Sequence, residues 1–513
     1  MFAVTELQPM RRPLVAGLIK AIVVGSAAAA LASGCASLPE PHRANLASES
    51  STVQGCAAWF QALDQAIDED GVRDAGDYRV PGYPYLRVDR FLASFRAKAE
   101  TDGNGFAAWF GHMRERDATA RRYELRNLAA ARLTALGISG REQASARTEE
   151  CAGQLAHRDL ASPLARKRLA ERAVVPDDYS NWQRALGLYG LARIPFARGV
   201  ERWHDEALAL FREPRDGGSP SRTFWRYGPS GTARVARQAS AILAGVQLDP
   251  LGIPALSRAD RDRLLAAYAP VFEIETTGSF DRFGPIAWGR SPSPEVDPSR
   301  PTVYGRLAHT RYGDRTLVQL VYSIWFPERP QDGPFDLLAG KLDGVVLRVT
   351  LSQDGEPLVY DSIHPCGCFH MFFPTPLAQP RQRPEGDDEW AFIPATVPAP
   401  GSGQRIAVRI ASRSHYLLAI APVSEQPTDR TYDIADEDEL RSLPAGDGAW
   451  RSAFGPDGLV PGTERAERVL FWPMGIASAG AMRQWGKHAT AFLGRRHFDD
   501  ANLLEQRFRI LPR

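Results

Sequence analysis

The stretch "TLVQLVYSIWF" (Thr316–Phe326) is rich in β-branched and aromatic residues, and it is apolar at both odd and even positions. Successive side chains of a β-strand point to opposite faces. A run that is apolar at both parities therefore predicts a strand buried on two sides, as in the middle of a β-sandwich. Similar runs at Val345–Leu351 and Pro357–Ile363 predict neighbouring strands.

A later stretch, "RIAVRIAS" (405–412), has a different pattern. Arg405, Ala407 and Arg409 alternate with isoleucine and valine. This alternation predicts a strand with one buried and one solvated face.

The sequence before residue 270 predicts helices. In "DATARRYELRNLAAARLTALG" (Asp117–Gly137), leucine and alanine recur three and four residues apart, and Gly137 is a typical helix end. Another helical segment, "ERWHDEALALF", places His204 and Glu206 beside Trp203. It lacks the paired histidines of a zinc helix and is interpreted as a solvated helical face.

We therefore expect an α+β protein with an N-terminal α-helical bundle, a mainly antiparallel β-sandwich-like domain and a helical or irregular C-terminal tail. The expected divisions are a signal peptide (1–34), a tether (35–51), the helical domain (52–270), the β domain (271–432) and the tail (433–513). A change of hydrophobic period after the Pro- and Ser-rich segment 290–301 supports the separation of helical and β sequence.

The N-terminus has the order of a secretory signal. Arg11 and Arg12 precede a mostly apolar run that ends in "LASGC", with Cys35 as its last residue. The end of this run resembles the lipobox of bacterial lipoproteins, whose cysteine receives diacylglycerol on sulfur and a fatty acid on its amine. This resemblance implies a lipid on Cys35 and, because Ala36 follows, attachment to the outer membrane on its periplasmic face. A plain transmembrane anchor or an ordinary cleaved signal are the alternatives.

The charge of the mature chain excludes some partners. Removing residues 1–34 leaves 59 basic and 60 acidic residues. A chain with so balanced a charge has no overall basic character that would attract nucleic acid or anionic lipid, and we expect membrane attachment through the N-terminal lipid rather than through a basic patch. An envelope protein or peptidoglycan is the expected class of further partner.

The five cysteines of an exported chain need separate explanations. Cys35 is expected to carry the lipid. Cys56 and Cys151 both lie in helical sequence and are expected to form a disulfide, with two buried thiols as the alternative. This pairing leaves Cys366 and Cys368 for a local role.

These two cysteines belong to "HPCGCFH", in which His364, Cys366, Cys368 and His370 occupy every second position. Thiolate and imidazole suit copper or zinc. In an extended strand, however, the two histidines would lie about 20 Å apart, so the chain must bend at Pro365 and Gly367 for all four to reach one metal. A smaller site of both cysteines and one histidine would be completed from elsewhere in the chain, with the following candidates: His309, His488 and His497.

Two other interpretations of the stretch remain open. A Cys366–Cys368 disulfide would also require a bend at Gly367, and the cysteines could equally be structural thiols. "GCFHM" resembles the stretch around the catalytic cysteine of L,D-transpeptidases, although His370 replaces an arginine of that family. That resemblance implies a cysteine nucleophile for acyl transfer in the cell envelope.

Two further segments bear on function. "VYSIWFPERP…AGKLDGVVLRVTL" is similar to the core of necrosis-inducing-type proteins; Asp343 matches the family's aspartate, but Lys341 and Leu342 replace its histidines, so its cation site is not implied. "RQWGKHATAFLGRRHF" (483–498) has the polar and aromatic mixture of a pocket wall, or of an exposed tail. The sequence contains no phosphate loop, dinucleotide fingerprint or Gly-x-Ser-x-Gly elbow. The leading hypothesis is a metal-binding His/Cys centre of unknown activity in an outer-membrane lipoprotein; a non-catalytic scaffold and the acyl-transfer enzyme are the alternatives.

Overall fold

The computed structural model of the chain describes residues 49–160, 162–212, 223–230, 236–387, 389–424, 426–446 and 448–512. The expected signal peptide, the lipidation site Cys35 and most of the expected tether lie outside the described residues.

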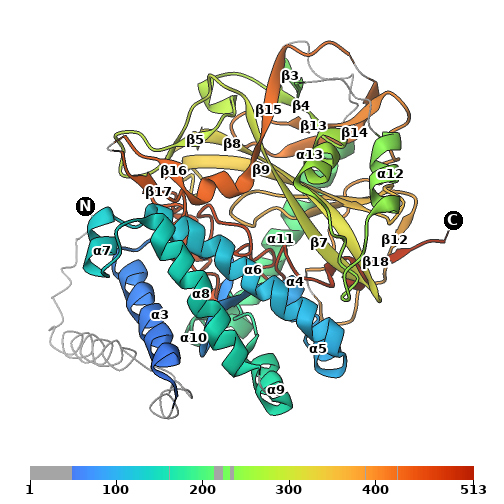
Figure 1. Cartoon of the computed structure of the whole chain (residues 1–513). Helices are drawn as coiled ribbons and strands as arrows, with labels where there is room; N and C mark the ends of the chain where they lie inside the picture. The colour runs from blue at the N-terminus through green and yellow to red at the C-terminus, as the bar shows by residue number, and fades with distance from the viewer. Residues whose placement is uncertain are drawn as a thin grey trace, which may run out of the picture. The chain divides into compact units, whose positions relative to one another are not determined.

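The described helices include long members before residue 213 and short ones near the C-terminus (Figure 1). The α-helices are α3 (Ser51–Glu69), α4 (Arg90–Ala93), α5 (Arg96–Thr101), α6 (Gly103–Asn127), α7 (Ala130–Ala135), α8 (Arg141–Asp159), α9 (Pro163–Arg172), α10 (Asn181–Leu186), α11 (Tyr189–Arg212), α12 (Ala236–Gly245), α13 (Arg258–Ala267), α14 (Glu467–Leu470) and α15 (Leu503–Arg507). Short 3₁₀ helices are η1 (Ser279–Asp281), η2 (Glu437–Arg441) and η3 (Trp472–Met474).

The strands are concentrated after residue 223. They are β1 (Tyr78–Val80), β2 (Tyr83–Val88), β3 (Phe224–Pro229), β4 (Val271–Glu275), β5 (Ile286–Ala287), β6 (Glu295–Val296), β7 (Thr302–Tyr312), β8 (Arg315–Arg329), β9 (Gly340–Leu351), β10 (Pro357–Ile363), β11 (Met371–Pro374), β12 (Ala378–Pro380), β13 (Gln404–Ile410), β14 (Leu417–Ser424), β15 (Arg430–Asp436), β16 (Leu443–Pro444), β17 (Trp450–Arg451) and β18 (Phe508–Ile510).

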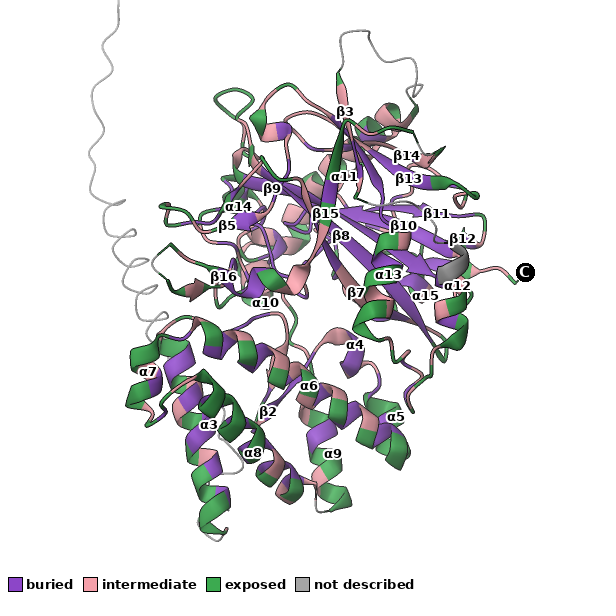
Figure 2. Cartoon of the chain, turned by 45° about the horizontal axis from the view of Figure 1, so that its top comes forward, coloured by how far each residue is buried: buried purple, intermediate pink, exposed green. Residues whose placement is uncertain are grey.

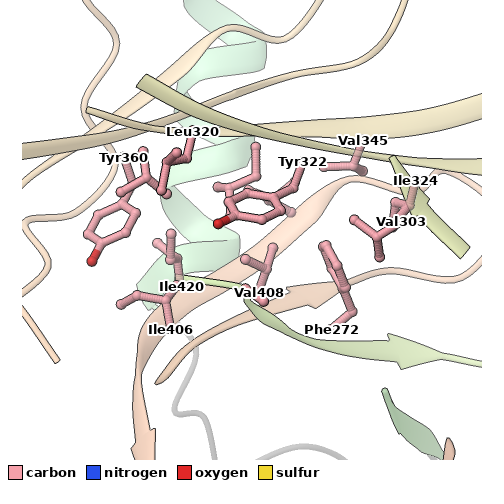
Figure 3. Packing of buried hydrophobic residues seen from close by; sticks show 14 of the residues in the cluster. Phe272, Val303, Leu320, Tyr322, Ile324, Val345, Tyr360, Ile406, Val408 and Ile420 are labelled. Atoms are coloured by element: carbon pink, nitrogen blue, oxygen red, sulfur yellow. The ribbon is translucent and has the colours of Figure 1, made fainter. Parts of the chain in front are cut away.

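Ten of these strands form one large mixed sheet in the order β11-β10-β9-β8-β7-β15-β3-β4-β13-β14. The pairings of β7 with β15, β15 with β3, and β4 with β13 are parallel, and the others are antiparallel. The sheet curls so that its two ends face each other. Figure 3 shows Leu320, Tyr322 and Tyr360 on one side of a shared core, opposite Ile406, Val408 and Ile420.

Strand β8 is buried on both faces, as its sequence predicts. Leu320, Tyr322 and Ile324 belong to the core enclosed by the curled sheet. Leu317 and Val321, of the opposite parity, pack instead against C-terminal residues that include Phe498 and Phe508. The alternation of a strand thus assigns each half of the apolar run to its own core.

Helices and loops cover the two faces of the sheet. Apolar residues of α11, α12 and α13 pack into the enclosed core, whereas α15 and β18 pack on the other face. In Figure 2 the strands β8, β9 and β10 are accordingly coloured mostly as buried. None of the described helices combines the length and apolar character needed to cross a membrane.

The expected mixture of helices and strands is confirmed, but the finer division into a helical bundle and a two-sheet sandwich is not. Residues Ser51–Arg513 form one compact unit, and the domain boundaries proposed from the sequence stay predictions. Strands β1, β2 and β3 interrupt the range 52–270 that was expected to be helical, and β3 joins the large sheet between β15 and β4.

Two local expectations are wrong. The helix expected over Asp117–Gly137 is two helices, because α6 ends at Asn127 and Leu128 has an extended backbone with ψ of 136°. Arg405 is buried rather than solvated, because its guanidinium donates hydrogen bonds to carbonyl oxygens at the C-terminal end of α13, including that of Ala269 at 3.0 Å. A cation is favourable there because it satisfies carbonyls that the helix leaves unpaired.

The predicted disulfide is present and joins α3 to α8. Cys56 and Cys151 have Cα atoms 4.9 Å apart and lie 95 positions apart in the sequence. Both are buried where the two helices pack together. A crosslink across so long a loop restricts the unfolded chain strongly.

We expect the double substitution Cys56→Ala with Cys151→Ala to lower the free energy of unfolding by about 2–5 kcal/mol. Urea unfolding of the oxidised protein and of the variant measures this difference. Peptide mapping of unreduced protein is the check: two alkylatable thiols at these positions would contradict the disulfide.

Candidate functional site

The stretch His364–His370 is the turn that connects β10 to β11. The amide of His364 donates to the carbonyl of Cys368 (3.0 Å), and the amide of Gly367 donates to the carbonyl of His364 (2.8 Å). Gly367 has a φ of +90°, and a Cβ at this position would collide with the backbone oxygen of Ala489. The chain therefore does bend at Gly367, as a shared metal site or a local disulfide would require, and only glycine fits this conformation without strain.

Cys366 and Cys368 are free thiols buried in an apolar cluster. The amide of Cys368 contacts the sulfur of Cys366 at 3.4 Å. The hydrogen bond to the Cys366 side chain, together with burial, raises the pKa of the Cys368 thiol well above its usual value. A protonated thiol is a poor nucleophile, so this geometry favours structural thiols over the acyl-transfer interpretation.

His364 belongs to a buried chain of ionisable groups. Its Nδ1 lies 3.2 Å from one oxygen of Asp343, and Nδ1 of His415 lies 2.8 Å from the other. Nε2 of His415 in turn lies 3.6 Å from Asp281. These four side chains were not connected by the sequence, because they come from four separate segments.

The charges in this chain of groups follow from opposing effects. Burial alone would raise the pKa of Asp343, but His364 and His415 hold it well below its usual value. Burial would lower the pKa of His415, but hydrogen bonds to Asp281 and Asp343 raise it. Burial dominates at His364 and lowers its pKa. His415 is therefore the cation that the two buried carboxylates share.

His370 points to a different carboxylate. Its Nε2 lies 3.0 Å from Asp361, which also accepts two hydrogen bonds from Arg348 at 3.0 and 2.5 Å. Burial lowers the pKa of His370 to about 3 although Asp361 opposes the shift. Nδ1 of His370 has no hydrogen-bond partner among the described residues.

The other candidate ligands are also dispersed. His309 stacks on Phe91 with ring centroids 5.3 Å apart, and His488 is buried with its ring near Phe498. His497 lies within 3.5 Å of Asp177. Burial lowers the pKa of both His309 and His488 to about 3.

These positions do not assemble the predicted metal centre. Within the part of the chain that the structure describes, no group of three or more His, Cys, Asp and Glu side chains could hold a metal ion. His364 and His370 each contact a different aspartate. Copper or zinc at this turn stays a prediction from the sequence.

The turn instead borders a pocket of about 560 Å³, which we call the aromatic pocket. Its walls come from α11, the turn, and loops of the C-terminal half. The aromatic residues that line it are Phe196, Trp203, Phe369, Trp390, Phe392, Tyr416, Phe471 and Phe492. Polar and charged side chains in the wall are Arg202, His204, Cys368, His370, Glu389, Glu467, Thr490, Tyr416 and Arg496.

The interpretation of α11 as a solvated face was wrong for two of its residues. Trp203 and His204, interpreted as part of a solvated face, are half-buried in the pocket wall. The His204 ring stacks on Phe392 with centroids 4.1 Å apart, and burial lowers its pKa to about 4. The only signal in the sequence was the mixed apolar character of this helix, which does not reveal what covers it.

The segment 483–498 does contribute pocket walls. Thr490, Phe492 and Arg496 line the aromatic pocket. Trp485 lines a second, polar cavity of about 230 Å³. In that cavity Arg306 pairs with Asp438 at 2.6 Å and Arg116 with Asp77 at 3.0 Å, so these charged groups already have partners within the chain. We therefore take the aromatic pocket as the candidate site.

Two kinds of charged group line the aromatic pocket. Glu389 and Arg496 are fixed: the Glu389 carboxylate accepts from the amides of Phe492 (2.7 Å) and Leu493 (3.0 Å), and Arg496 donates to the Glu389 carbonyl (2.8 Å). Burial raises the pKa of Glu389 and also that of Glu467, which reaches about 7. Near neutral pH, Glu467 can therefore donate or accept a hydrogen bond.

Comparisons with known proteins identify no relative: no protein-family profile, no curated protein and no solved structure matches the chain.

The pKa of His370 predicts a pH effect on stability. The folded value of about 3 lies below the usual value of roughly 6.5, so between pH 4 and 6 unfolding takes up a proton at this residue. Stability therefore falls as the pH falls through this range. We expect His370→Gln to reduce the slope of unfolding free energy against pH by about 1.4 kcal/mol per unit.

Urea unfolding at several pH values between 4 and 6 measures this slope. His157→Gln, at an exposed position of α8, is the matched control and should leave the slope unchanged. A slope equal to that of the unsubstituted protein in His370→Gln would show that this histidine is not held neutral by the fold.

Proposed function

We propose that the chain is a lipid-anchored protein of the outer membrane, on the periplasmic side, that binds a largely apolar ligand in the aromatic pocket. The observation that carries the ligand-binding proposal is a pocket of about 560 Å³ with eight aromatic residues in its wall. Pockets for small molecules in proteins commonly measure about 300–1,000 Å³ and combine an apolar lining with a few polar groups.

The aromatic wall is held in place by its own contacts. Trp203 packs against Phe369 and Phe392 with centroids 5.3 and 5.2 Å apart. Phe471 and Phe492 form a second pair at 4.5 Å. A wall formed before binding reduces the entropy that binding would otherwise cost, so these contacts support a preformed site.

The polar groups indicate the character of the ligand's polar end. Glu467 has a pKa of about 7, and the Tyr416 hydroxyl accepts a hydrogen bond from Arg329 at 3.3 Å. Each can take part in a hydrogen bond without burying a strong unpaired charge. The ligand class that fits is an aromatic or acyl molecule ending in a hydroxyl, an amide or a weak acid.

The remaining parts of the proposal come from the sequence. The lipid on Cys35 would hold the protein at the membrane, and an envelope component is the expected source of the ligand. We retain the N-terminal helical bundle and the sandwich-like β part as a proposed organisation. Metal is not required for binding of this kind.

Filling the pocket tests the proposal directly. Gly199 lies in α11 on the pocket wall, and a Cβ added there meets no atom within 4 Å. We expect Gly199→Leu to weaken binding of N-phenyl-1-naphthylamine, an uncharged aromatic probe, at least tenfold. Fluorescence titration of the compact unit Ser51–Arg513 measures the affinity.

Gly190→Leu is the control, because Gly190 is exposed in the same helix and also has open space at its Cβ. Both changes favour helix formation by about 1 kcal/mol, so neither should unfold the protein. The proposal fails if the two variants bind the probe equally well, or if the unsubstituted unit does not bind it.

The anchor has its own test. We expect Cys35→Ser to abolish lipid attachment, because serine has no sulfur to accept diacylglycerol. The variant should lose the mobility shift caused by the lipid and should leave the membrane fraction or accumulate as an unprocessed precursor. Fractionation and intact-mass measurement decide this; an unchanged mass and membrane yield would contradict the lipoprotein assignment.

A further inference from the structure

Exposed apolar side chains gather around the aromatic pocket. Of the twelve large apolar side chains that are exposed in the described part of the chain, nine lie on three segments, namely α10 with α11, the loop between β8 and β9, and the segment that contains α14; α11 and the other two segments contribute to the pocket wall. Five are between Trp182 and Ile194, and the others are Phe335, Leu337, Val469 and Leu470. We call these nine side chains the apolar rim.

The three segments meet in space. Phe196 of α11 packs against Phe471 with centroids 5.1 Å apart, and Trp182 packs against Trp472 at 5.6 Å. The amide of Glu467 donates to the carbonyl of Leu337 at 3.2 Å. The rim is therefore one surface rather than scattered residues, and contiguous exposed apolar surfaces mark interaction sites.

Several side chains of the apolar rim are highly exposed, and one rim residue has an unusual backbone conformation. Leu186 is 71% exposed, Val469 76% and Phe335 90%. Leu188 is also exposed, and its φ of +50° is in the left-handed region, which residues with a Cβ adopt rarely.

The charges in one part of the rim suit a lipid surface. From Asn181 to Val200 the chain has three arginines, Arg184, Arg193 and Arg198, and no acidic residue, whereas the other two segments are mixed, with Asp336 beside Phe335 and both Glu467 and Arg468 beside Val469. Helices that lie in the membrane interface combine leucine and tryptophan with arginine in this way, and basic residues are attracted to an anionic surface. Trp182 and Trp472 provide the aromatic side chains that favour the interface.

We propose that the apolar rim inserts into the headgroup and upper acyl region of a membrane containing anionic phospholipid, with the pocket next to the lipid. In this arrangement an apolar ligand could pass between the bilayer and the pocket without crossing water. Insertion goes beyond the lipid anchor, because an anchor alone leaves the orientation of the body undetermined. The passage of ligand between the bilayer and the pocket rests on the proposed function. Insertion of the rim does not.

Photolabelling of the full-length protein on membranes tests insertion. The lipidated protein is reconstituted into vesicles of phosphatidylethanolamine and phosphatidylglycerol that contain a carbene precursor confined to the acyl region. Labelled peptides are then quantified by mass spectrometry. We expect the peptides of the rim to be labelled at least fivefold more than those containing Leu164 and Leu248, which are 57% and 55% exposed but lie elsewhere.

Matched variants separate insertion from folding and from pocket binding. Leu186→Asp with Leu191→Asp should reduce labelling of Phe335 and Leu470 at least fivefold, whereas Leu164→Asp with Leu248→Asp should not change it. Gly199→Leu should keep the rim labelled even where probe binding is lost, which distinguishes failure of insertion from failure of the pocket proposal. Equal labelling of rim and control peptides would overturn the inference, as would protection of the rim by a second copy or another protein in crosslinking.

Discussion

Strand β8 has apolar side chains on both faces, and burying both of them is the constraint on which the rest of the structure depends. One face is covered because the ten-stranded sheet curls until β13 and β14 lie opposite β8, β9 and β10. The other face is covered by the C-terminal segment, whose Phe498 and Phe508 pack on Val321 and Leu317. A strand with only one apolar face would have required neither.

Covering the second face has a consequence for the polar residues beside β10. His364 and His370 lie at the ends of a turn that Arg483 holds from the C-terminal segment, through hydrogen bonds to the carbonyls of Pro365 and Cys366. Buried polar groups without partners are costly, and the fold provides Asp343 for one histidine and Asp361 for the other. The row of potential ligands in the sequence is thus divided between two separate ion-pair networks.

The same C-terminal segment gives the molecule its pocket. The residues near Glu467 and Arg496 leave a space between themselves and α11. Aromatic side chains line this space. The exposed leucines of α10 and α11 continue this apolar surface outward. The two proposals, ligand binding in the pocket and insertion of the rim, both rest on this apolar surface.

What the sequence determined by itself is local. Alternation and composition identified β8 and its neighbours, the residue type of Gly367 permitted the bend that the structure has there, and export with cysteine parity identified the Cys56–Cys151 disulfide. These predictions succeed because period, backbone freedom and covalent pairing belong to short segments or to residue types. The failures, at Arg405 and at Trp203 with His204, concern residues whose exposure is decided by a distant partner. The sheet order, the pairing of His364 with Asp343 and His415, and the aromatic pocket were decided only by the tertiary structure, because each joins segments that the chain separates and whose register depends on how two apolar faces are buried together.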